Sequence, residues 1–301
     1  MRDDVGIRTN ELSKQYPGTS TLALDKLSLQ VKRGEVYGFL GANGAGKTTT
    51  IRLLMNFLQP TSGDAVILGM DTVDDSVEIK KRVGYLSGDI ALYPKASGSQ
   101  LLDFLAGLQG MHSSEYRRTL EVRFQADLDK PIGSLSKGNR QKLGILQALM
   151  HEPDVLILDE PTSGLDPLMQ EAFYDSLREA KERGAAIFMS SHNLAEVQRV
   201  CDRVGIIKAG RLLREENIQE GKQVGGAMFR VRFVSPEAVE KIRRNKELTI
   251  LSQEDSQTVV VKSDATLSRT LKLLAQQDIA EFNSHELDLE GEFIEYYGEQ
   301  P

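Results

Sequence analysis

The run Gly-Ala-Asn-Gly-Ala-Gly-Lys-Thr-Thr at residues 41–49, called here the phosphate loop, combines a flexible backbone with one cationic and two hydroxyl side chains. It contains the phosphate-loop pattern, in which a glycine is followed after four residues by Gly-Lys-Thr. Glycines let backbone N–H groups converge on an anion, because no side chain blocks the approach. We therefore expect Lys47 to reach the outer phosphates of a nucleotide and the Thr48 hydroxyl to bind Mg²⁺.

The segments that flank the phosphate loop are those that an anion site needs. Glu35–Leu40 is a short apolar run that predicts a buried strand, and Thr50–Leu58 has helical spacing. The start of that helix adds unpaired donors and a positive dipole end. A Gly-rich turn without a ligand is the alternative, which the strand-to-helix setting disfavours. The predicted nucleotide contacts in the loop are Gly41, Asn43, Gly44, Ala45, Gly46, Lys47, Thr48 and Thr49.

Two carboxylates form a second candidate site. Four apolar residues, 155–158, precede Asp159 and Glu160, a pattern typical of a central parallel strand. Ligands of such sheets bind at the carboxyl ends of strands, so Asp159 is expected to hold Mg²⁺ near Thr48, directly or through water. Glu160 would orient or deprotonate an attacking water. The alternative, an exposed acidic pair, would be favoured in a chain without a phosphate loop.

Two further positions, His192 and Tyr16, have a structural and a functional interpretation each, and Ser136 and Gly138 indicate the start of a helix. A strand at 185–189 brings His192 to the same sheet edge, where it could bind a γ-phosphate, although a lone histidine is more often structural. Tyr16 is either a turn residue packed on a sheet or a ring that stacks on a nucleotide base. Ser136 is a good helix cap, and Gly138 lets backbone approach closely.

Composition limits the classes of protein. The 301 residues are 40% hydrophobic and 27% charged, typical of a soluble protein with one large or two ordinary domains. We find no membrane-length apolar run and no signal peptide. The single Cys201 excludes an internal disulfide and suits a reducing cytosol. A net charge of −7 argues weakly against a nucleic-acid partner.

The elements around these motifs alternate between strands and helices. Residues 5–33 are predicted to form two or more strands around a turn, with alternation at 7–12 and 22–31. Further strands are predicted at 64–68, 83–86, 203–207 and 211–215, and helices at 76–82, 143–151, 168–183 and 193–200. From Gly98 to about Leu128 the pattern is helical instead, which predicts a helical insert at about 89–150. One apolar face of that insert comprises Leu101, Leu102, Phe104, Leu105 and Leu108.

Residues 221–301 are predicted to form a separate, small α+β domain. Strands at 228–234, 258–261 and 279–283 and helices at 236–244, 265–276 and 289–297 suggest the order β-α-β-β-α-β. We find no catalytic constellation there, and we interpret Tyr296-Tyr297 as packing or dimer surface.

Together the motifs of residues 5–220 resemble the ATP-binding cassette (ABC) ATPases. The phosphate loop, Leu135–Gln141 (the signature segment), Val155–Glu160, Ser163–Asp166 and His192 occur in the order of that family. The resemblance implies an α/β P-loop NTPase of ABC type at 1–220, with an antiparallel β subdomain and a helical insert. The tail at 221–301 resembles the C-terminal extension of bacterial exporter cassettes, including Leu289–Phe293, and suggests dimerisation or regulation.

The resemblance also implies how the site works. Two cassettes would close head to tail, so that Ser136 and Gly138 of one chain touch the γ-phosphate bound by the other. Asp166 would couple the two sites, and Tyr16 matches the base-stacking aromatic. The catalytic residues would be Lys47, Glu160 and His192, and the metal ligands Thr48 and Asp159.

Two departures from the family pattern stand out. The signature usually reads Leu-Ser-Gly-Gly-Gln, whereas this chain has Lys137 and Asn139 at its third and fifth positions. The glutamine that normally touches Mg²⁺ and the attacking water is replaced by Gly88. Asp89, one residue on, is the expected substitute ligand for the metal.

The leading hypothesis is that the chain is the ATP-hydrolysing subunit of a transporter, and export is favoured over import. It would act with ATP and Mg²⁺ through a separate multi-span membrane permease, pair with a second copy or a related cassette, and lie on the cytoplasmic face of the cell membrane. One alternative is a soluble cassette ATPase that acts on DNA or ribosomes; another is a nucleotide-binding regulator that hydrolyses weakly, suggested by Gly88. The transported substrate is not predicted.

Overall fold

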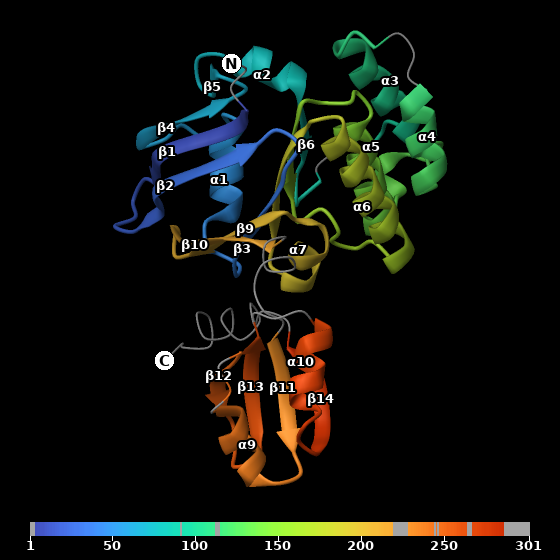
Figure 1. Ribbon diagram of the computed structural model, residues 1–301. Helices are drawn as coiled ribbons and strands as arrows, with labels where there is room; N and C mark the ends of the chain where they lie inside the picture. The colour runs from blue at the N-terminus through green and yellow to red at the C-terminus, as the bar shows by residue number, and fades with distance from the viewer. Residues whose placement is uncertain are drawn as a thin grey trace. The chain divides into compact units, whose positions relative to one another are not determined.

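The computed structural model describes residues 4–90, 92–111, 115–218, 228–243, 245, 247–263 and 267–285. The chain divides into two compact units, Met1–Asn217 and Ile218–Pro301 (Figure 1). The predicted helix at 289–297, with the Leu289–Phe293 and Tyr296-Tyr297 segments, lies outside the described residues.

The first unit contains a six-stranded sheet in the order β10-β9-β3-β8-β7-β6. All neighbours are parallel except β9 and β10. Every residue of the strands on either side of β8 is buried, as a sheet covered on both faces requires. The strands are β3 (Val36–Leu40), β6 (Val83–Leu86), β7 (Val155–Asp159), β8 (Ala186–Ser191), β9 (Arg203–Lys208) and β10 (Arg211–Asn217).

A second, antiparallel sheet in this unit confirms the predicted β subdomain. Its order is β2-β1-β4-β5. The strands are β1 (Val5–Gln15), β2 (Leu22–Lys32), β4 (Ser62–Ile67) and β5 (Met70–Asp71).

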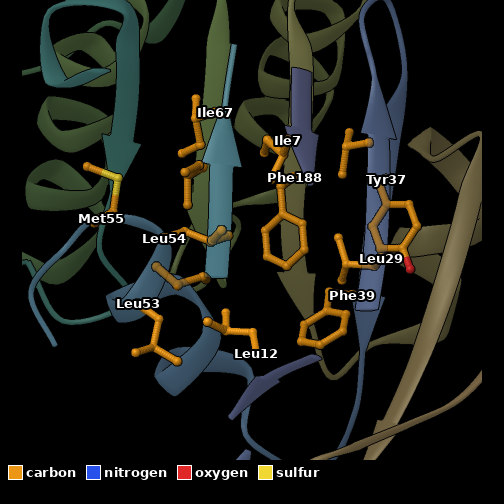
Figure 2. Close-up of a cluster of buried hydrophobic side chains, with 14 of the residues drawn as sticks. Ile7, Leu12, Leu29, Tyr37, Phe39, Leu53, Leu54, Met55, Ile67 and Phe188 are labelled. Atoms are coloured by element: carbon orange, nitrogen blue, oxygen red, sulfur yellow. The ribbon is translucent and has the colours of Figure 1, made fainter. Parts of the chain in front are cut away.

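One hydrophobic cluster joins both sheets to α1 (Lys47–Leu54), the helix that follows the phosphate loop (Figure 2). Ile7 of β1, Leu53 of α1 and Phe188 of β8 all contribute to it and are at most 2% exposed. Burying each such side chain stabilises the fold by about 1.5–3 kcal/mol. The strand and the helix that flank the phosphate loop are therefore fixed by the same core.

The helix after the phosphate loop is shorter than predicted. It ends at Leu54 rather than Leu58, because Asn56 takes a left-handed φ of 52° that an α-helix does not continue through. The next helix, α2 (Ser76–Arg82), has the predicted bounds.

The remaining helices of the first unit confirm the insert but correct two details. Ser136 caps α5, so that helix begins at Lys137 and not at Leu143. Within the predicted apolar face of α3, Phe104 and Leu108 are 58% and 68% exposed. The helices are α3 (Gly98–Leu108), α4 (Glu115–Phe124), the 3₁₀ turn η1 (Ile132–Ser134), α5 (Lys137–Leu149), α6 (Pro167–Glu182) and α7 (Leu194–Val200). Nowhere in the described ranges is a helix long and apolar enough to cross a membrane.

The second unit has the predicted β-α-β-β-α-β order in a four-stranded antiparallel sheet, β12-β13-β11-β14. The strand β12 (Leu248–Gln253) lies outside the three strand ranges predicted for this unit. Phe229, Val231, Ile242 and Leu274 belong to its own hydrophobic core. The elements are β11 (Met228–Phe233), α9 (Pro236–Arg243), β12 (Leu248–Gln253), β13 (Thr258–Ser263), α10 (Leu267–Leu274) and β14 (Ile279–His285).

Candidate active site

The phosphate loop joins β3 to α1 through backbone conformations that glycine adopts readily. Gly44 and Gly46 have φ values of 82° and 114°. A Cβ added at Gly46 would lie 2.8 Å from the carbonyl oxygen of Ala23, so no side chain fits there. Gly46 is the N-cap of α1 and offers no side-chain cap, which leaves the first N–H groups of that helix available to an anion.

The Lys47 ammonium lies against the loop and is only 6% exposed. Its Nζ donates to the carbonyl oxygens of Gly41 at 2.7 Å and Ala42 at 3.3 Å. It also forms an ion pair with Glu160, with 3.3 Å between Nζ and Oε1. Contacts within the chain therefore hold the Lys47 ammonium beside the phosphate loop.

Asp159, the last residue of β7, connects two other elements of the site. It is 4% exposed and accepts hydrogen bonds from Thr48 Oγ1 at 3.0 Å and from Ser190 Oγ at 2.6 Å. The parallel strands β7 and β8 end side by side, and Thr48 comes from α1, so three segments that are far apart in sequence meet at one carboxylate.

Glu160 lies between the side chains of Lys47 and His192. Its Oε2 lies 2.5 Å from His192 Nδ1, and its Oε1 faces Lys47. Its backbone has a φ of 49°, a left-handed conformation that is strained for a glutamate. The Glu160 N–H points at the Ser190 carbonyl and hydroxyl oxygens, at 3.3 and 3.2 Å. The contacts with Lys47 and His192 hold the Glu160 carboxylate between the carboxyl end of β7 and the phosphate loop.

The other residues predicted to bind nucleotide line the same loop. The Tyr16 hydroxyl lies 3.3 Å from Thr49 Oγ1, which brings the ring next to the helix after the loop. Asn43 and Gly44 are exposed at the turn, whereas Ala45 is buried and its N–H donates to the Ala42 carbonyl. The base-stacking role of Tyr16 stays a prediction.

The signature segment supplies two further predicted nucleotide contacts, Ser136 and Gly138. Ser136 is exposed, and its Oγ accepts from the Asn139 N–H at 3.3 Å. Gly138 packs on the loop after β7, where an added Cβ would lie 3.0 Å from the Gly164 carbonyl oxygen. Within the described residues, no hydrogen bond or ion pair joins Ser136 or Gly138 to the phosphate loop.

Gly88 lies beside Asp159, the predicted Mg²⁺ ligand, and no hydrogen bond among the described residues ties Asp89 to this carboxylate. A Cβ added at Gly88 would lie 3.3 Å from the Asp159 carbonyl oxygen and 3.4 Å from Oδ2. Asp89 is exposed and makes no hydrogen bond or ion pair to a residue that the structure describes. Its proposed contact with Mg²⁺ stays a prediction.

Sequence reasoning gave no role to Ser190 or Glu196. Ser190 contacts both carboxylate residues, and its signal is a hydroxyl at the end of a strand adjacent to β7. Glu196 is 6% exposed and accepts from Ser191 Oγ at 2.6 Å, one residue before His192. Burial raises the pKa of Glu196, and the Ser191 hydrogen bond opposes that shift.

Comparisons with known proteins place this geometry in a family context. The ABC transporter profile matches residues 24–163. The chain is 42% identical over 212 residues to the bacitracin transport ATP-binding protein BcrA of Bacillus licheniformis, covering 69% of each chain. It is 32% identical over 298 residues to the ABC transporter ATP-binding protein YcbN of Bacillus subtilis (strain 168), covering 96% of this chain and 95% of YcbN. A solved ATP-binding subunit of an ABC transporter matches with a TM-score of 0.67 and 31% identity, over 72% of this chain and 92% of that one.

Proposed function

The chain belongs to the ATP-binding subunits of ABC transporters, which bind and hydrolyse ATP, and on that premise we propose that it powers export through a separate membrane permease. The observation that carries the catalytic part is the meeting of Thr48, Asp159 and Glu160 beside Lys47. The relatives are transporter proteins, so they lend no support to action on DNA or ribosomes.

In the proposed reaction, a water oxygen attacks the γ-phosphorus of ATP while the bond to the bridging oxygen breaks and ADP leaves. Glu160 orients this water or takes its proton. Lys47 neutralises charge on the outer phosphates, and His192 binds the γ-phosphate. The ion pair of Lys47 with Glu160 supports this scheme, because the cation already lies between the phosphate loop and the proposed base.

The donor set at the carboxyl end of β7 suits Mg²⁺, which prefers oxygen ligands and keeps several waters. Thr48 Oγ1 and Asp159 Oδ2, 3.0 Å apart, would hold it. No group of three His, Cys, Asp or Glu in the described ranges could form a metal cage, so phosphate and water oxygens would complete the shell, with Asp89 as a further predicted ligand. The bound ion would neutralise phosphate charge.

We also propose that each ATP is shared by two copies of the chain, or by this chain and a related cassette. Ser136 and Gly138 would face the γ-phosphate of the second subunit, and Asp166 would couple the sites. The exposed start of α5 supports this arrangement, because its first turn has no acidic side chain and its cap, Ser136, accepts from its own backbone.

The permease is expected to bind near the helical insert, on the cytoplasmic face of the cell membrane. Large apolar side chains are exposed there: Tyr93 at 70%, Phe104 at 58% and Leu108 at 68%. BcrA is a bacitracin transport protein, which favours export of a small molecule here. Co-purification of a multi-span membrane protein that Phe104→Asp abolishes would support this assignment; nucleic acid in its place would contradict it.

For residues 221–301 we propose an accessory domain, with the ATPase at 1–220. The separate core of the second unit supports this division, since the buried residues of that core all belong to the second unit. If the domain mediates dimerisation or regulation, a chain truncated after Asn217 keeps ATP binding but changes its oligomeric state or its basal turnover.

The decisive test of the catalytic assignment is Glu160→Gln, which keeps the shape of the side chain and removes its basicity. We expect ATP binding to persist and the turnover number to fall about 10²-fold or more. Glu171→Gln on α6 is the matched control and should match the parent. Equal turnover in Glu160→Gln and the parent removes Glu160 from this role, and a parent without turnover favours the weakly hydrolysing regulator.

A further inference from the structure

Lys137 links the signature segment to the loop that begins at Glu160. It is the first residue of α5, and its Nζ donates to Ser163 Oγ at 3.0 Å. Ser163 in turn closes a turn, because its backbone N–H donates to the Glu160 carbonyl oxygen at 3.2 Å. Two consecutive hydrogen bonds therefore connect the lysine side chain to the backbone of the proposed base.

The helix dipole does not favour a lysine at the first position of α5, so the presence of Lys137 there needs another explanation. The first turn of a helix carries the positive end of the dipole, which favours acidic side chains, and the first turn of α5 has none. The usual glycine of the family would bring no charge. A specific contact such as that with Ser163 offsets this local cost.

The turn that Lys137 contacts also needs support. The left-handed φ of Glu160 persists only where surrounding contacts hold it. On one side Ser190 receives the Glu160 N–H. On the other side α5 holds the loop twice, since Gln141 Nε2 also donates to the Pro161 carbonyl oxygen at 2.6 Å. The helix that bears the signature thus braces the strained segment.

We propose that Lys137 is a positioning residue for hydrolysis, which holds the turn from Glu160 to Ser163 and thereby keeps the Glu160 carboxylate between Lys47 and His192. The inference rests on the proposed role of Glu160. Since no described contact joins Lys137 to the phosphate loop of its own chain, its loss changes turnover more than the affinity of that loop for ATP.

The test is a double-mutant cycle of Lys137→Met and Ser163→Ala, read as steady-state ATPase kinetics. Methionine keeps helix propensity and removes the donor. Each single variant should lower kcat about three- to tenfold, the size of one exposed charge-assisted hydrogen bond, with KM for ATP nearly unchanged. The double variant should be no slower than the slower single one.

Two further variants separate positioning from general damage. Lys137→Arg keeps a donor and should restore most of kcat. Lys142→Met removes a lysine of the same helix that makes no hydrogen bond or ion pair to a described residue, and it should match the parent.

The remaining outcomes would overturn either the proposed function or this inference alone. A parent chain without turnover, or Glu160→Gln as fast as the parent, overturns the proposed function and this inference with it. An active, Glu160-dependent parent whose kcat is unchanged in Lys137→Met, or whose two single losses add in the double variant, overturns this inference alone. Should Lys137→Met fail to fold, unchanged kcat in Ser163→Ala overturns it.

Discussion

The phosphate-loop side and the signature side of the nucleotide site differ in how much geometry one chain supplies. Lys47 and Asp159 are 6% and 4% exposed, and each is held by contacts within the chain. Ser136 is exposed at the start of α5, where its hydroxyl only caps its own helix. The first side is formed by folding alone, whereas the second would offer its donors to the second copy proposed above.

The physical reason lies in the elements that carry each side. Parallel strands place all their carboxyl ends at one edge, so Asp159 and Ser190 meet because β7 and β8 are neighbours. The start of α5 is instead tied to the loop after β7 by the side chains of Lys137 and Gln141. A helix start that is exposed and uncompensated by acidic residues is suited to an anion from a second molecule.

The largest effects are expected from one change on each side. Lys47→Ala removes the buried cation and should lower kcat/KM for ATP about 10²-fold or more, the cost of losing one preorganised electrostatic contact.

Ser136→Asp keeps an equally good helix cap but points a negative charge at the phosphate of the second copy, and should lower kcat at least tenfold. Ser136→Asn, a neutral cap, is the matched control. Thermal unfolding should not distinguish Ser136→Asp from its control.

Mixing these two inactive variants tests whether the sides belong to different chains. Random pairing makes about half of the dimers mixed, and each mixed dimer has one intact site out of two, so about a quarter of parental activity should return. No recovery at concentrations that saturate the dimer would mean that Lys47 and Ser136 serve one site of the same chain.

The difference between the phosphate-loop side and the signature side also explains which features could be predicted from the sequence. The phosphate loop and Val155–Glu160 are local patterns whose glycines and apolar run already specify a turn and a buried strand. The roles of Ser190 and Lys137 depend on which strand and which loop lie next to them in space, and no local pattern carries that information.

Local deviations from the predicted elements have equally specific causes. The early end of α1 depends on a single left-handed residue, Asn56, inside a run with helical spacing. The exposure of Phe104 could not be predicted from its spacing, because periodicity identifies an apolar face but not what covers it.

An effect of intermediate size is expected at Gly88, where this chain departs from the glutamine that is usual in its family. Gly88→Gln places an amide beside Asp159, and its Cβ would lie 3.3 Å from the Asp159 carbonyl oxygen, so a small backbone adjustment suffices. We expect the Mg²⁺ concentration for half-maximal turnover to fall about two- to fivefold, the value of one polar contact. Gly88→Ala, with the same Cβ and no amide, should show no gain. A rise in the Mg²⁺ requirement of Gly88→Gln alone would mean that the amide blocks the site.

The smallest effect concerns His151, which follows the packed end of α5 and has no part in either side of the site. Burial lowers the pKa of His151, so the folded chain favours the neutral ring. The unfolded chain binds more protons as the pH falls through about 6.5, and the stability that the neutral ring contributes is lost there. Glu196, whose pKa is raised, has the opposite sign, since its contribution is lost as the pH rises.

The difference between the parent and His151→Gln isolates the histidine. From pH 7.5 to 5.5 the parent Tm should fall further than that of the variant, because only the parent carries a ring whose protonation favours the unfolded chain. Turnover at pH 7.5 should be equal in the two proteins, because the signature end of α5 is braced by Lys137 and Gln141 independently of its packed end. A variant that loses turnover at pH 7.5 while its Tm is unchanged would show that the two ends of α5 are coupled, and that the signature side depends on more of the fold than its local contacts.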